Sequence, residues 1–172
     1  MKTVIDIAQY LKSQNERNYV LFMTGIYSGL RVSDILDLRI RDVRNRTYIS
    51  IREKKTKKEK RFTINSELRK IISDYVKDKQ DFEYLISNPA DHKALSRQQA
   101  YNIIRSAGER FGVYNLGTHT MRKTFGYHMY RMTNDAVMLM KLFNHADVQI
   151  TLRYIGITQD EMDSAVKKLR FR

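Results

Sequence analysis

Residues 19–38 read YVLFMTGIYSGLRVSDILDL, a stretch that predicts two helices with a break between them. Apolar side chains recur at helical spacing from Val20 to Tyr27, which indicates a strongly apolar first helix. Gly29 is well placed to end it, because glycine adopts the left-handed backbone of a helix C-cap without steric cost. Ser33 is predicted to cap a short second helix that continues to Leu38.

The rest of the chain favours helix as well, since it contains only one proline and seven glycines. Thr3 is predicted to cap a helix at the start of the chain, and Ser96 a later one. Further helices are expected over residues 67–79, 97–111, 120–132, 135–143, 147–154 and 160–169.

Two segments alternate polar and apolar residues, which is the period of a β-strand. They are residues 47–51 (TYISI) and 61–64 (RFTI), and the turn between them is strongly basic. A third short strand is predicted at residues 83–86. The expected fold class is therefore mainly α with a small antiparallel β-sheet (α+β), in a length that suits one compact domain.

The charge balance points to a polyanionic partner. The 172 residues contain 32 Lys+Arg and 19 Asp+Glu, which gives a net charge of +13 and a pI of about 9.9. Nucleic acid is the first candidate and an anionic membrane surface the second. No basic amphipathic helix with large apolar anchors is present, so we expect no membrane partner. The absence of cysteine excludes disulfides and thiol chemistry, and it suits a reducing cytoplasm.

Several common catalytic devices are missing from the sequence. No acidic cluster has the spacing of magnesium ligands, and no histidine pair has the spacing of a zinc site. No phosphate-binding glycine loop of the GxxxxGK[ST] or GxGxxG type occurs. We therefore expect no metal and no cofactor.

What remains is a set of residues suited to a phosphate group. Arg31 is predicted near a helix N-terminus, and Asp34 shares its face and could orient the guanidinium. His119 and Arg122 are one helical turn apart, so both can face one anion. Tyr154 follows His145 by nine residues. Taken singly, each has an ordinary alternative: a solvated arginine at a helix start, or a tyrosine that packs in the core.

Together these residues resemble one family. The strings GLRVSDIL (29–36), HTMR (119–122) and FNHADVQITLRY (143–154) have the order and spacing of the tyrosine recombinases, also called the phage integrase family. The resemblance covers the chain from about residue 20 to its C-terminus. It implies a catalytic domain that cleaves and rejoins DNA through a covalent 3′-phosphotyrosyl link, without a metal.

The resemblance also implies a role for each matched residue. Tyr154 would be the nucleophile, and Arg31 and Arg122 would stabilise the charge of the transition state. His119 would assist proton transfer and His145 would donate to a phosphate oxygen. The hairpin lysine that protonates the leaving 5′-oxygen would be Lys55, with Lys54 or Lys57 as alternatives if the register differs.

Double-stranded DNA is the implied partner. The residues expected to bind it, besides those of the site, are Lys54, Lys57, Lys58, Arg97, Gln98 and Lys123. Arg97 and Gln98 suit base edges in the major groove, although a merely polar helix start explains them equally well. The segment 160–169 would either pack on its own core or dock onto another protomer on DNA.

We expect residues 1–172 to form a single catalytic domain that lacks the family's N-terminal DNA-clamping (core-binding) domain. A catalytic fragment is favoured over an unusually short member. The expected setting is the cytoplasm of a bacterium, with a phage or mobile element as the source. The alternatives are a non-catalytic DNA-binding regulator that reuses the fold, and a type IB topoisomerase-like enzyme that relaxes DNA.

Overall fold

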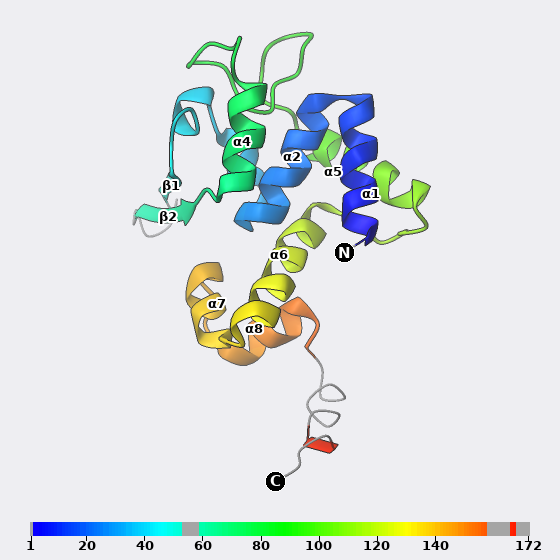
Figure 1. Ribbon diagram of the computed structural model, residues 1–172, viewed down its shortest axis with the longest axis vertical. Coiled ribbons are helices and arrows are strands. Elements are labelled where there is room, and N and C mark those ends of the chain that lie inside the picture. Colours follow the sequence, from blue (N-terminus) through cyan, green and yellow to red (C-terminus); the bar gives the residue numbers. More distant parts are fainter. Residues whose placement is uncertain (1, 53–58, 158–165, 168–172) are drawn as a thin grey trace. The chain divides into compact units, whose positions relative to one another are not determined.

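A computed structural model describes residues 2–52, 59–157 and 166–167 of the chain (Figure 1). These residues belong to two compact units, Met1–Arg122 and Lys123–Arg172. The boundary falls inside helix α6 (Thr118–Thr133), so the first turn of this helix belongs to the first unit and the rest to the second.

The first unit begins with α1 (Lys2–Gln14), α2 (Glu16–Ser28) and α3 (Val32–Asp37). Gly29 ends α2 in the left-handed conformation, with φ of 62°, as predicted. The two predicted N-caps are wrong, because Thr3 lies inside α1 and α3 begins before Ser33. The N-cap of α3 is Arg31, whose side chain makes no capping hydrogen bond, and Ser33 lies inside the helix.

The sheet consists of β1 (Tyr48–Arg52) and β2 (Glu59–Thr63), paired antiparallel with Ile49 opposite Phe62. Both of these side chains are buried, as the alternating pattern predicts. A short 3-10 helix, η1 (Ile40–Asp42), precedes the sheet.

The third strand predicted at residues 83–86 is wrong. Among the described residues this part of the chain forms only isolated bridges, Arg39 with Tyr84 and Ser87 with Ala94. Leu85 donates its backbone N–H to the carbonyl of Leu38, whereas the carbonyl of Ile86 accepts from Leu95, so the pairing partner changes within two residues and no continuous ladder forms.

Helices α4 (Ser66–Tyr75) and α5 (Arg97–Arg110) complete the first unit together with the start of α6. Helix α2 packs against α1, α3, α4 and α5, so its buried face forms the centre of this unit. Ser96 caps α5 as predicted, and Gln99 completes a capping box with it. Figure 1 shows α4 following directly on β2.

The second unit contains the remainder of α6, α7 (Ala136–Phe143) and α8 (Val148–Ile155). Its core is formed by Leu139, Phe143 and Ile155. Gly126 of α6 permits close packing there, because a Cβ at this position would lie 2.7 Å from Cγ2 of Ile155. Asn144 ends α7 in the left-handed conformation, with φ of 57°.

The observed architecture confirms the predicted fold class, mainly helical with a small antiparallel sheet. The predicted helix at 160–169 lies outside the described residues, except that Val166 and Lys167 are helical. Within the described part of the chain, no helix is both long and apolar enough to span a bilayer.

Candidate active site

Arg122 is tied to the end of helix α2. Its side chain is only 5% exposed, and Nη1 donates a hydrogen bond to the carbonyl oxygen of Gly29. The preceding residue, Met121, packs against Gly25 in α2, where a Cβ would lie 2.7 Å from the methionine Sδ. This close approach brings the start of α6 onto the C-terminal end of α2 and holds the guanidinium against the main chain.

Arg31 and Asp34 lie at the start of helix α3, directly after Gly29 and Leu30. Arg31 is exposed, and the Asp34 carboxylate accepts a hydrogen bond from its backbone N–H. Burial raises the pKa of Asp34, and this effect exceeds the opposing influence of the positive charges on Arg31 and Arg122. The first unit therefore gathers two arginines around one partly buried carboxyl group.

His119 lies in the first turn of α6, one turn before Arg122, and is exposed. The turn that leads into this helix is closed by a hydrogen bond from the backbone N–H of Gly117 to Oγ1 of Thr120. The spacing predicted from the HTMR string is thus realised on a helix.

His145 is oriented by a threonine in the second unit. Its Nδ1 lies 3.0 Å from Oγ1 of Thr151, a fully buried residue. The same hydroxyl lies 3.4 Å from the carbonyl oxygen of Asp147, a distance at the limit of a hydrogen bond. The shorter contact is therefore the stronger one. The contact with the Thr151 hydroxyl fixes the orientation of the imidazole ring, as hydrogen-bonding partners of functional histidines commonly do.

Tyr154 lies in α8 among aromatic rings of the same unit. The ring of Phe143 meets it edge-on at 5.6 Å between centroids, and the ring of His145 does so at 5.2 Å. The ammonium group of Lys123 lies over the tyrosine ring, 5.5 Å from its centroid. These contacts bring together the predicted residues Lys123, His145 and Tyr154.

The predicted site residues thus form two groups, Arg31, Asp34, His119 and Arg122 in the first unit, and Lys123, His145 and Tyr154 in the second. Arg97 and Gln98 are exposed in the first turn of α5, where Gln98 donates to the side chain of Asn102. The hairpin residues Lys54, Lys55, Lys57 and Lys58 lie outside the described residues.

The sequence reasoning missed two features of these groups. One is the carbonyl of Gly29 as the anchor of Arg122, which joins residues 93 positions apart and has no local signal. The other is Thr151 as the partner of His145. A signal for Thr151 was available, since it is a polar residue one helical turn before Tyr154, on the side of the helix that faces the core.

No group of three or more His, Cys, Asp or Glu side chains with metal-binding geometry occurs in residues 2–52, 59–157 and 166–167. The positive charge beside Asp34 comes from the guanidinium groups of Arg31 and Arg122. Each guanidinium can supply paired N–H donors to phosphate oxygens.

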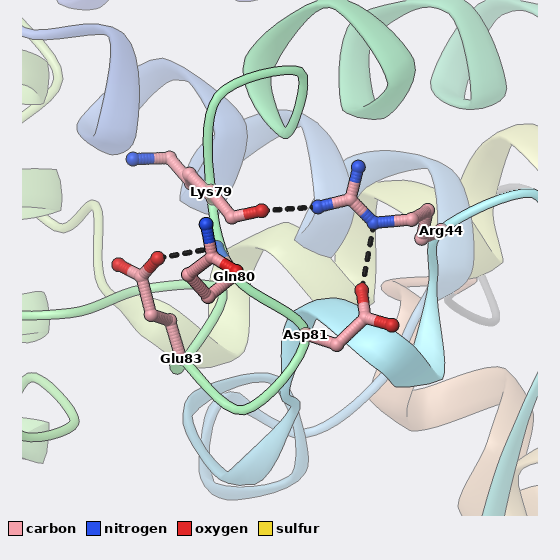
Figure 2. Close-up of polar contacts among 5 residues, drawn as sticks. All are labelled: Arg44, Lys79, Gln80, Asp81 and Glu83. Carbon is pink, nitrogen blue, oxygen red and sulfur yellow. Dashed lines mark hydrogen bonds and ion pairs between the residues drawn. The ribbon is translucent and has the colours of Figure 1, made fainter.

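An open cleft of about 680 Å³ lies elsewhere in the first unit, between residues 43–47 and α4. Its basic rim includes Arg44, whose Nε donates to Asp81 at 2.8 Å and whose Nη2 donates to the carbonyl oxygen of Lys79 (Figure 2). These two hydrogen bonds from Arg44 stabilise the turn at residues 79–81. None of the predicted site residues lines this cleft.

The sequence of this chain is similar to those of known proteins. The model of the phage integrase family matches residues 1–161. The Bacillus subtilis (strain 168) protein named probable integrase/recombinase YoeC is 43% identical over 167 residues, which cover 97% of this chain and 92% of that protein. Tyrosine recombinase XerA of Pyrococcus horikoshii is 25% identical over 99% of this chain, and the match covers 59% of XerA.

Solved structures agree on the fold. The crystal structure of XerA recombinase aligns with a TM-score of 0.79 at 20% identity, over 99% of this chain and 62% of that one. XerH recombinase bound to its palindromic difH substrate aligns with a TM-score of 0.73 at 17% identity, over 97% of this chain and 51% of XerH. The chain belongs to the phage integrase family, whose members are DNA strand-transferring enzymes. It spans between half and two thirds of the length of the Xer recombinases that it matches.

Proposed function

We propose that this chain is the catalytic domain of a site-specific DNA recombinase or integrase that works through a covalent 3′-phosphotyrosyl intermediate. The observation that carries the proposal is the buried guanidinium of Arg122, anchored on the Gly29 carbonyl beside Arg31 and Asp34. A buried arginine held in place at a polar corner is suited to binding an anion whose charge increases during reaction.

The chemistry follows from the residue types. The Tyr154 oxygen attacks the phosphorus of one phosphodiester, so an O–P bond forms as the bond to the 5′-oxygen breaks. The phenol loses its proton, with His119 as the assisting group, and the leaving 5′-oxygen gains one from Lys55 or its neighbours Lys54 and Lys57. Arg31, Arg122 and His145 stabilise the pentacoordinate transition state by donating to phosphate oxygens. Attack by another 5′-hydroxyl reverses these steps and exchanges the strands.

The proposed mechanism needs no metal, because two guanidinium groups provide the positive charge that a magnesium ion supplies in other phosphoryl transfers. No cofactor and no external energy are needed either, since the phosphotyrosyl bond retains the free energy of the diester. We expect strand cleavage to continue in the presence of a chelator.

The proposed partner is double-stranded DNA. The net charge of +13 supports it, as does the likeness of the fold to XerH, a recombinase whose structure holds its difH substrate. Arg97, Gln98 and the hairpin lysines remain predicted DNA contacts. The docking of residues 160–169 onto another protomer and a cytoplasmic location also remain predictions.

The decisive experiment uses a nicked suicide DNA site that traps the cleaved state. Wild-type protein is expected to form a covalent adduct, and Tyr154→Phe to form none. The matched control is Tyr114→Phe, at a tyrosine that is 74% exposed, which should form the adduct at the wild-type level. An adduct in the Tyr154→Phe reaction would refute the mechanism.

The same protein preparation separates the alternatives. A non-catalytic DNA-binding regulator would shift the DNA in a gel and form no adduct. A topoisomerase-like enzyme would relax supercoiled plasmid at low protein concentration, without a second DNA partner. We expect DNA binding by this chain to weaken steeply as salt increases, because phosphate contacts dominate it.

A further inference from the structure

The contact between Lys123 and Tyr154 suggests a role beyond binding DNA. The lysine ammonium lies 5.5 Å from the centroid of the tyrosine ring. Phe143 and His145 meet the same ring edge-on, at interplanar angles of 76° and 74°. The tyrosine ring is therefore contacted by two aromatic neighbours and by one cation over its face.

Such a contact acts on the nucleophile in two ways. The attraction between the cation and the negative face of the ring favours one orientation of the side chain. A positive charge beside a phenol also favours the ionised oxygen, which forms as the bond to phosphorus develops. Both effects act on Tyr154 itself, whereas a lysine that binds only a DNA phosphate acts on the affinity for DNA.

We propose that Lys123 is a positioning residue for Tyr154, which orients the ring and favours its ionisation during strand cleavage. The inference rests on the proposed function, in which Tyr154 is the nucleophile. Lys123 is exposed on α6 and is the first residue of the second unit, to which His145 and Tyr154 also belong.

The test separates cleavage from binding. Lys123→Gln removes the charge, Lys123→Arg keeps it, and Arg153→Gln removes a neighbouring exposed charge from α8 as a matched control. Single-turnover cleavage of the nicked site is measured at saturating DNA, and the dissociation constant separately. Lys123→Gln should cleave about three- to tenfold more slowly, whereas Lys123→Arg and Arg153→Gln should stay within about twofold of wild type.

Two results would overturn the inference. If saturating DNA restores the wild-type cleavage rate to Lys123→Gln, then Lys123 acts only through DNA affinity. If Lys123→Arg is as slow as Lys123→Gln, the positive charge is not the cause of the effect.

A second measurement needs neither DNA nor activity. In the NMR spectrum of the DNA-free protein, the ε-methylene protons of Lys123 should lie upfield of those of the other lysines, because they face an aromatic ring. The signal is assigned by its loss in Lys123→Arg, and it should move to the ordinary lysine position in Tyr154→Leu. An ordinary position in wild type would overturn the inference. That outcome would not affect the adduct test of the proposed function. Conversely, an adduct formed by Tyr154→Phe would refute the proposed function but would not show that the contact between Lys123 and the tyrosine ring is absent.

Discussion

Replacement of Thr151 by valine removes the hydroxyl that contacts His145 and keeps the shape of a fully buried side chain. The 3.0 Å contact with Nδ1 is a full hydrogen bond, worth about 1 kcal/mol net, while the 3.4 Å contact with the Asp147 carbonyl contributes less. His145 is half-buried, so water can replace part of the lost bond. We expect the free energy of unfolding to change by no more than about 1 kcal/mol.

The expected effect on cleavage is larger than the effect on the fold. Without the hydroxyl, the imidazole of His145 loses the contact that orients it, and we expect its orientation toward a phosphate oxygen to be lost. A loss of about 1 kcal/mol from the transition state slows cleavage about fivefold, and we expect a decrease of about five- to tenfold.

The assay is single-turnover cleavage of a nicked site, combined with thermal unfolding of the same samples. Thr133→Val is the matched control, because Thr133 donates to a carbonyl four residues earlier, at 2.9 Å, without contacting a histidine. Thr151→Ser retains the hydroxyl and should restore most of the rate. Wild-type cleavage by Thr151→Val would refute the assigned role of this contact.

Three further substitutions test other parts of the structure. Gly25→Ala places a methyl group 2.7 Å from Sδ of the buried Met121. The cost of overpacking, about 1–3 kcal/mol, should exceed the gain of about 1 kcal/mol in helix propensity. We therefore expect both the unfolding temperature and the cleavage rate to fall. Asp34→Asn tests the raised pKa of this carboxyl. Because the folded state favours the protonated acid, wild-type stability should fall relative to the variant as the pH rises from about 4 through the raised pKa. Urea unfolding of both proteins at several pH values measures this. A difference in unfolding free energy that does not change with pH would contradict the prediction. Ser96→Ala removes the capping box that Ser96 forms with Gln99 and should cost about 1 kcal/mol, or roughly 2–4 °C in melting temperature, while cleavage at saturating DNA stays unchanged.

Local features of the sequence were sufficient where local chemistry decides the structure. Gly29 ends α2 in the left-handed conformation and Ser96 caps α5, as predicted, because each of these features depends on a few neighbouring residues. The caps predicted at Thr3 and Ser33 failed for a different reason. Several residues near a helix start are suited to the N-cap position, and α1 and α3 begin at Lys2 and Val32, which places Thr3 and Ser33 inside the helices.

The predicted site shows the same division. The pairing of His119 with Arg122 follows from helical spacing, and the structure places both on α6. The bond from Arg122 to the Gly29 carbonyl depends on how two distant segments pack, which no local pattern indicates. The lysine over the Tyr154 ring is likewise a tertiary contact, since the two residues are on different helices.

The anchor of Arg122 has a consequence for how this protein can change through evolution. A side-chain partner can be lost by a single base change, but every residue has a carbonyl oxygen, so substitution at position 29 does not delete the acceptor. What substitution can do is move it, because the left-handed backbone at Gly29 disfavours other side chains. The residues around position 29 can therefore vary in composition, within the limits set by this backbone conformation, without loss of the hydrogen bond to Arg122.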